Sequence, residues 1–207
     1  MVDTQVRPAD VTKFPIIDAM LQVPRERYVP QSLREAAYVG ENLPLGDGRV
    51  MLDPRSLAKL LDMLSVGPTD VVLDIGCGHG YSTAVLAHLA EFVVGLEADA
   101  DRAADAQATL SENGVDNAAV VDGPLEEGAA KSGPYDVIVL QGAAIEVPKA
   151  ILDQLREGGR IGCIFAQGAL GVARIGRKVD GRVGWRDAFN AGAPVLPGFG
   201  RAAAFAF

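Results

Sequence analysis

One short stretch combines an acid with three glycines at fixed spacing, and it is the strongest candidate for a ligand-binding site. Asp74 ends an apolar run, and Gly76, Gly78 and Gly80 then alternate with other residues, including Cys77, before a helical pattern begins. Glycine has no Cβ, so a ligand can approach the backbone closely at such a turn. The free N–H groups at the start of the following helix suit a carboxylate or a phosphate. The turn therefore predicts an adenosine-containing cofactor without choosing which one.

Two further acids end the apolar runs that follow. Glu97 closes the run 93–96, where a carboxylate can accept hydrogen bonds from both hydroxyls of a ribose. Asp122 closes the run 118–121, where it can accept from an adenine amino group, and Gly123 keeps the wall beside it open. A helix-capping or solvated acid would also explain Glu97, and an ordinary turn would also explain Asp122. Asp99 is expected to cap the next helix.

Two cofactor classes compete for this site. A nicotinamide dinucleotide site usually shows G-x-G-x-x-G. This chain has G-x-G-x-G, with Asp74 two residues before the first glycine, an arrangement that resembles motif I of the class I S-adenosyl-L-methionine methyltransferases. The pattern favours S-adenosyl-L-methionine, with S-adenosyl-L-homocysteine as product.

A parallel sheet is needed to bring these residues together. The apolar runs are nearly continuous, as expected for strands buried on both faces, and they alternate with helical patterns. The sequence predicts a doubly wound, mostly parallel α/β fold, in which ligands collect at the carboxyl ends of the strands. The expected strands are 70–75, 92–97, 118–122, 135–140 and 159–166; the expected helices are 80–90, 99–112, 147–156 and a weaker one near 124–131. Residues 172–175 and 202–207 are expected to add one or two antiparallel strands.

The first part of the chain predicts a cap on this domain. It is rich in proline and charge, and apolar residues between Ile16 and Leu21 recur at helical spacing, so we expect one or two short helices and then extended loops. Asp53 and Pro54 form a helix-start signal ahead of a leucine stripe. We therefore expect an N-terminal cap on the substrate side at 1–52 and a cofactor-binding α/β domain at 53–207, which together form one compact unit.

Composition narrows the class of protein. The chain has 207 residues and a net charge of −8, which disfavours nucleic acid as a partner. It contains no apolar run long enough to cross a membrane and does not start like a signal peptide. Its two cysteines, Cys77 and Cys163, have no metal-ligand spacing and predict no disulfide framework. We expect a reduced, cytoplasmic protein without a bound metal.

Several segments outside the glycine turn resemble one methyltransferase family. The segment 23–30 follows the pattern VPRE-x-[FY]-VP, and the segments 43–48, 133–136 and 155–160 are also similar. With the glycine turn, they make the chain resemble the protein-L-isoaspartate O-methyltransferases over nearly its whole length. The resemblance implies a Rossmann-like class I methyltransferase that methylates the side carboxylate of L-isoaspartyl residues in damaged proteins or peptides, as protein repair. The positions that match the family's cofactor-binding residues are Asp74, Gly76, Gly78, Gly80, Glu97, Asp122 and Gly123. Cys77 lies within the same turn and is either part of that site or a small filler.

The chain departs from the family at one place. Where the family reads T-I-S-Q-P, with the serine hydroxyl in the active site, this chain reads Val50-Met51-Leu52-Asp53-Pro54. Leu52 cannot donate a hydrogen bond, and Asp53 would repel an isoaspartyl carboxylate. If the acceptor were an alcohol or an amine, a base would be needed, and Asp53 and His79 are the candidates.

Three hypotheses remain open from the sequence. The first is an isoaspartate-repair methyltransferase, the second a methyltransferase of the same fold with another acceptor, and the third a non-catalytic protein that keeps the cofactor pocket. The segment 193–199 is expected to form a loop that helps to wall the substrate cleft. The sequence leaves the oligomeric state undetermined.

Overall fold

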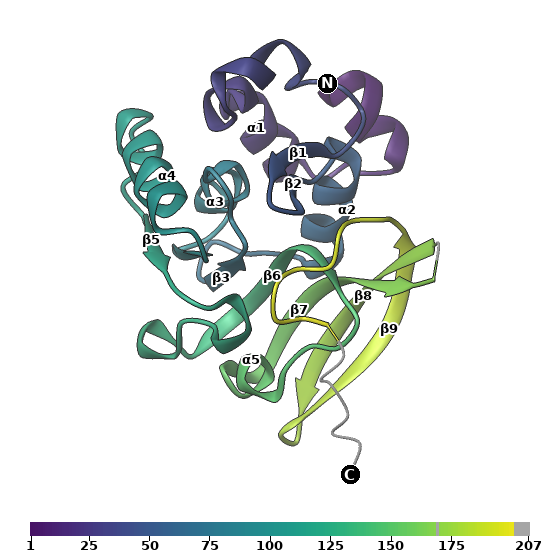
Figure 1. Cartoon of the computed structure of the whole chain (residues 1–207). Helices are drawn as coiled ribbons and strands as arrows, with labels where there is room; N and C mark the ends of the chain where they lie inside the picture. Colours follow the sequence, from purple (N-terminus) through teal and green to yellow (C-terminus); the bar gives the residue numbers. More distant parts are fainter. Residues whose placement is uncertain (169, 201–207) are drawn as a thin grey trace.

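A seven-stranded sheet forms the centre of the structure, a computed structural model in which residues 1–168 and 170–200 are described (Figure 1). The strand order is β5-β4-β3-β6-β7-β8-β9. The strands from β5 to β7 pair in parallel, whereas β7–β8 and β8–β9 pair antiparallel. Their bounds are β3 Val71–Ile75, β4 Phe92–Glu97, β5 Ala118–Asp122, β6 Tyr135–Ala144, β7 Leu155–Gln167, β8 Leu170–Val179 and β9 Arg182–Asn190.

Each face of the sheet is covered by its own hydrophobic cluster. Successive side chains of a strand point to opposite faces, so Val72 belongs to one cluster and Leu73 to the other. The first cluster includes residues of α2 (Pro54–Leu64), α3 (Tyr81–Ala87) and α4 (Ala100–Glu112). The second includes residues of α5 (Lys149–Asp153) and the loop that follows β9. This arrangement confirms the doubly wound α/β prediction.

Helix α2 begins where the sequence predicts. The Asp53 side chain accepts a 2.9 Å hydrogen bond from the backbone N–H of Ser56, and Pro54 occupies the first turn. Asp53 therefore satisfies one of the donors that a helix start leaves free. The buried stripe lies against the sheet and consists of Leu57, Leu60, Leu61 and Leu64.

The N-terminal segment is built from short helical pieces and one hairpin. Its helical pieces are η1 Val2–Val6, η2 Arg7–Ala9, α1 Phe14–Gln22, η3 Arg25–Tyr28 and η4 Gln31–Ala36. The hairpin consists of β1 Leu43–Gly46 and β2 Arg49–Met51, which pair antiparallel. In Figure 1 these purple and blue segments lie beside α2 and α3, and their buried apolar residues join the cluster of those helices. There are more helical pieces here than the one or two we expected.

Two expected helices differ from the structure. The helix expected at 147–156 is wrong in extent: α5 covers only Lys149–Asp153, because Leu155 already pairs with Tyr135 as the start of β7. Near 124–131 two short turns, η5 Leu125–Glu127 and η6 Ala130–Ser132, replace one helix, and Gly128 between them has φ +70°.

The carboxyl-terminal part contains the expected antiparallel strands in a longer form. The run at 172–175 lies within β8, which forms a hairpin with β9. The strand expected at 202–207 lies outside the described residues. Within the described part of the chain, no helix has the length and apolarity that a bilayer crossing requires.

Candidate cofactor and active site

Asp74, at the end of β3, holds three neighbouring segments together. Its buried carboxylate accepts hydrogen bonds from Ser82 Oγ at 2.6 Å, Thr83 Oγ1 at 2.7 Å and Gln141 Nε2 at 2.7 Å. These donors come from the start of α3 and from β6. Burial raises the pKa of Asp74 to about 6, and the three donors oppose that rise. Asp74 therefore fixes the shape of the turn, while its expected role in cofactor binding stays a prediction.

The glycine turn adopts a backbone that other residues rarely adopt. Gly76, Gly78 and Gly80 have φ of +79°, +60° and +92°. The backbone N–H groups of Gly76 and Cys77 both donate to the carbonyl of Leu96, at 2.8 Å and 3.1 Å, which ties the turn to β4. A side chain at these glycines would add left-handed backbone strain.

Cys77 is buried behind the turn. Its Sγ lies 3.2 Å from the position that a Cβ on Gly95 would take, so it packs against β4. Burial raises the pKa of its thiol well above the ordinary value. These contacts favour a packing role over a reactive one.

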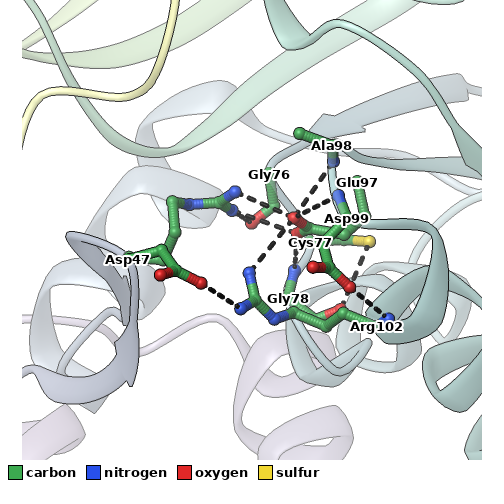
Figure 2. Close-up of polar contacts among 9 residues, drawn as sticks. Asp47, Gly76, Cys77, Gly78, Glu97, Ala98, Asp99 and Arg102 are labelled. Carbon is green, nitrogen blue, oxygen red and sulfur yellow. Dashed lines mark hydrogen bonds and ion pairs between the residues drawn. The ribbon is translucent and has the colours of Figure 1, made fainter.

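Glu97, at the end of β4, is fully buried and accepts hydrogen bonds from several directions (Figure 2). The backbone N–H of Gly78 donates to Oε2 at 2.9 Å, and that of Ala98 donates to Oε1 at 3.0 Å. Arg49 donates from Nη1 to Oε1 at 2.9 Å and from Nη2 to Oε2 at 3.1 Å. The carboxylate expected to bind ribose hydroxyls is thus paired with an arginine of the hairpin.

A second arginine reaches the same carboxylate from α4. Arg102 Nη1 lies 3.4 Å from Glu97 Oε1, and its Nη2 lies 3.4 Å from Oδ2 of Asp47 in the hairpin turn. Asp99 caps α4 by accepting a 2.7 Å hydrogen bond from the backbone N–H of Arg102, as its position in the sequence predicts. These contacts connect the hairpin turn to the end of β4 (Figure 2).

Open space adjoins the ends of β4 and β5. A cavity of about 440 Å³ is lined by residues that include Asp122, Gly123 and Leu96. A second, of about 210 Å³, lies beside Glu97 and Arg49. Asp122 is exposed, and the larger cavity falls within the usual volume range of ligand pockets. This is the place where we expect the adenine.

The space at the glycine turn itself is almost closed. Leu52 is buried and lines a cavity of only about 10 Å³, which has room for about one water molecule. The other lining residues are Leu45, Val50, Met51, Leu57, Gly76, Cys77, Tyr81, Ser82 and Gln141. The structure thus places the expected active-site position 52 directly beside the glycine turn.

The two candidate bases lie in different surroundings. The Asp53 carboxylate caps α2 by accepting a 2.9 Å hydrogen bond from the backbone N–H of Ser56, and the backbone N–H of Asp53 donates to Asn42 Oδ1 at 2.8 Å. His79 is half-buried, and burial, together with the charge of Arg102, lowers its pKa. Proton transfer by either residue stays a prediction.

Sequence reasoning missed Arg49. The available signal was its position, since Arg49 stands between the Gly46-Asp47-Gly48 turn and the Val50–Pro54 segment. It also missed that the loop 193–199 packs against the glycine turn. Leu196 Cδ2 lies 3.4 Å from the position that a Cβ on Gly76 would take and 2.6 Å from the corresponding position on Gly142. The loop therefore lies against the same turn as the hairpin.

The polar groups at the strand ends fit an adenosyl cofactor. Glu97 and Asp122 supply carboxylate acceptors, and the glycine turn supplies backbone without side chains, at the carboxyl ends of neighbouring strands. The side chains of Arg49, Leu45 and Leu196 lie against that backbone. The recognition groups are thus present, and the hairpin and the loop lie close over them.

A comparison with models of known protein families identifies the family of this chain. The model described as "Protein-L-isoaspartate(D-aspartate) O-methyltransferase (PCMT)" matches residues 4–188. The chain belongs to this family. Curated members called protein-L-isoaspartate O-methyltransferase include one from Methanoculleus marisnigri, 37% identical over 161 residues, covering 78% of this chain and 73% of that protein. One from Koribacter versatilis is 34% identical over 183 residues, covering 88% of this chain and 82% of that protein.

Solved structures of the protein-L-isoaspartate O-methyltransferase family share the fold. One superposes with a TM-score of 0.82 at 24% identity, covering 94% of this chain and 64% of that longer chain. A Plasmodium falciparum protein described as such a methyltransferase, solved in complex with S-adenosyl-L-homocysteine, gives a TM-score of 0.79 at 21% identity and covers 92% of this chain and 94% of that one. The expected family and fold class are confirmed.

Proposed function

We propose that this chain is an S-adenosyl-L-methionine-dependent methyltransferase that methylates the side carboxylate of L-isoaspartyl residues in damaged proteins or peptides. The observation that carries the proposal is the family match over residues 4–188. It is supported by position 52, which lies beside Gly76 and Gln141 in one small cavity at the strand ends. In proteins of this architecture, ligands bind at that edge of the sheet.

We assign the cofactor contacts to the groups at the strand ends. Glu97 would accept the ribose hydroxyls, Asp122 the adenine amino group, and the turn Gly76–Gly80 would hold the methionine part, with Asp74 keeping that turn in shape. When bound, the cofactor supplies an activated methyl group. The free N–H groups at the start of α3 suit its carboxylate.

The acceptor needs little activation from the protein. A carboxylate with a reference pKa of about 3.9 is ionised at neutral pH, so it can act as the nucleophile without a general base. The apolar side chains of Leu45, Met51 and Leu52 would exclude water and confine the acceptor oxygen near the glycine turn. The product is a methyl ester, which can cyclise to a succinimide.

One observation favours a second candidate function. Leu52 is buried where the family's serine would stand, so the hydroxyl that would orient an isoaspartyl carboxylate is absent. A methyltransferase of the same fold with another acceptor, or a non-catalytic cofactor-binding protein, would be compatible with this change. An alcohol or amine acceptor would then require a base such as Asp53 or His79.

Transfer of a radiolabelled methyl group separates these functions. We expect base-labile labelling of an isoaspartyl peptide and no labelling of the matched peptide with a normal aspartyl residue. Calorimetric titration with S-adenosyl-L-homocysteine is measured in parallel. Binding without transfer to the isoaspartyl peptide would contradict the repair activity and leave the second candidate.

We further propose a cytoplasmic location and the division into a cap at 1–52 and an α/β domain at 53–207. The location is supported by Cys77 and Cys163, which are buried and unpaired, as is usual in a reducing compartment. The net charge of −8 supports protein or peptide substrates rather than nucleic acid.

A further inference from the structure

The side chain of Arg49 enters the cofactor site from the cap. Besides its two contacts with Glu97, its Nη2 donates a 2.8 Å hydrogen bond to the carbonyl of Gly76. The side chains of Arg49 and Glu97 are 2% and 0% exposed. One guanidinium thus bridges the ends of β3 and β4, the two strands that carry the expected cofactor contacts.

The hairpin also fills the open side of the glycine turn. A Cβ on Gly76 would lie 2.7 Å from Arg49 Nη2, and one on Gly78 would lie 2.8 Å from Leu45 Cδ1. The space that glycine leaves for a ligand is therefore taken by the chain's own side chains. The remaining cavity of about 10 Å³ cannot hold any part of a cofactor larger than a water molecule.

Arg49 uses the same acceptors that a ribose would need. An ionised carboxylate offers about four lone-pair sites. Arg49, Gly78 and Ala98 already donate to Glu97, and Asp99 and Arg102 lie at 3.4 Å from it. Ribose hydroxyls can reach these oxygens only if the guanidinium leaves.

The closed arrangement carries a cost that would help it to open. Arg49 Nε is buried and has no hydrogen-bond partner among the described residues. The hairpin is a separate two-stranded sheet whose register shifts between Pro44 and Gly46. Such a small sheet is marginally stable by itself, so its position depends on side-chain contacts such as that of Arg49.

We propose that Arg49 is an internal ligand of the cofactor site, which latches the β1–β2 hairpin over the glycine turn and must be displaced before the cofactor binds. This inference rests on the proposed function in one respect: the cofactor must bind at the ends of β3 and β4. The latch lowers the apparent affinity, because only the open fraction of the protein is competent to bind. Access to the site is then set by the cap of the same chain.

Calorimetry with S-adenosyl-L-homocysteine tests the latch in the full chain. We expect Arg49→Gln to bind at least about tenfold more tightly than the wild type, since a closed fraction of nine-tenths costs that factor. Leu45→Ala, which clears the space before Gly78, should also bind more tightly. The matched control is Arg174→Gln, because Arg174 pairs with Asp187 on the β8–β9 hairpin. The affinity of this variant for S-adenosyl-L-homocysteine should equal that of the wild type.

Hydrogen exchange gives a second readout that needs no cofactor. Amides of residues 43–51 should exchange faster in Arg49→Gln than in the wild type, whereas those of β8 and β9 should be unchanged. Equal or weaker cofactor binding by Arg49→Gln, with a folded exchange pattern, would overturn the latch alone. Tighter binding without methyl transfer to the isoaspartyl peptide would overturn only the proposed function. Absence of binding by every protein would overturn both.

Discussion

The guanidinium of Arg25 donates a 2.7 Å hydrogen bond from Nη2 to the backbone carbonyl of Leu52. Its Nε donates to the carbonyl of Ala37, also at 2.7 Å, and the guanidinium lies 4.6 Å from the ring centroid of Tyr81. Arg25 is fully buried. The segment 23–30 is therefore joined to position 52, which we expect to lie in the active site, through a backbone carbonyl that does not depend on the side chain at that position.

Replacing Arg25 should destabilise the protein strongly. Arg25→Ala removes the donor from two buried carbonyls, at about 1–3 kcal/mol each, so the free energy of unfolding should fall by about 3 kcal/mol or more. Urea denaturation measures the change. The matched control, Arg34→Ala at an exposed position of η4, should stay within about 0.5 kcal/mol of the wild type. Equal losses for the two variants would contradict the stabilising role of the Arg25 hydrogen bonds.

Introducing a hydroxyl at position 52 should raise isoaspartyl methylation. Leu52→Ser supplies a donor beside the glycine turn, and misplacement of a substrate can cost about a hundredfold in rate. We expect a gain of up to about that factor, measured as radiolabelled transfer at saturating cofactor. Leu52→Ala is the control, because it opens similar space without a hydroxyl. An equal gain for both variants would assign the effect to space instead of hydrogen bonding.

A side chain at Gly78 should block the cofactor. Gly78→Val adds a branched group at φ +60°, where its Cβ would lie 2.8 Å from Leu45 Cδ1 in the space proposed for the ligand. We expect loss of detectable S-adenosyl-L-homocysteine binding in calorimetry. Gly114→Val is the matched control, since Gly114 has φ +71° and no atom within 4 Å of its Cβ position. Backbone strain should lower the free energy of unfolding of Gly114→Val by about 1–2 kcal/mol, whereas its affinity for S-adenosyl-L-homocysteine should equal that of the wild type.

The buried Asp74 should make stability depend on pH. Its pKa is raised from 3.8 to about 6, so between these values the folded state keeps a proton that the unfolded state has lost. The stabilisation is fully present below the unfolded pKa and is lost as pH rises through about 6.

Comparison with Asp74→Asn isolates this group. As pH falls from about 7 to about 4, the free energy of unfolding of the wild type should rise relative to that of the variant by about 2 kcal/mol. Urea denaturation at several pH values gives the difference, in which the other titrating groups cancel. A difference that is constant over this range would show that Asp74 titrates as an ordinary exposed carboxyl.

The α/β architecture, and the sheet edge at which we expect the cofactor, could be predicted from the residues alone. Nearly continuous apolar runs that alternate with helical patterns are typical of a parallel sheet covered on both faces, and Asp74, Glu97 and Asp122 lie at the ends of such runs. Local signals also located the start of α2 at Asp53, because capping depends on residues close together in sequence. The helix expected at 147–156 was wrong because sheet pairing of Leu155 overrides a local helical pattern.

What lies against the glycine turn became visible only in the folded chain. Arg49 is separated from Glu97 by 48 positions, and Leu196 is farther still from Gly76, so no periodicity in the sequence could bring them together. Their contacts depend on how the cap and the last loop pack around the strand ends. Packing of this kind is set by shape and by buried charge pairing over the whole chain, and it determines whether the recognised site is open or closed.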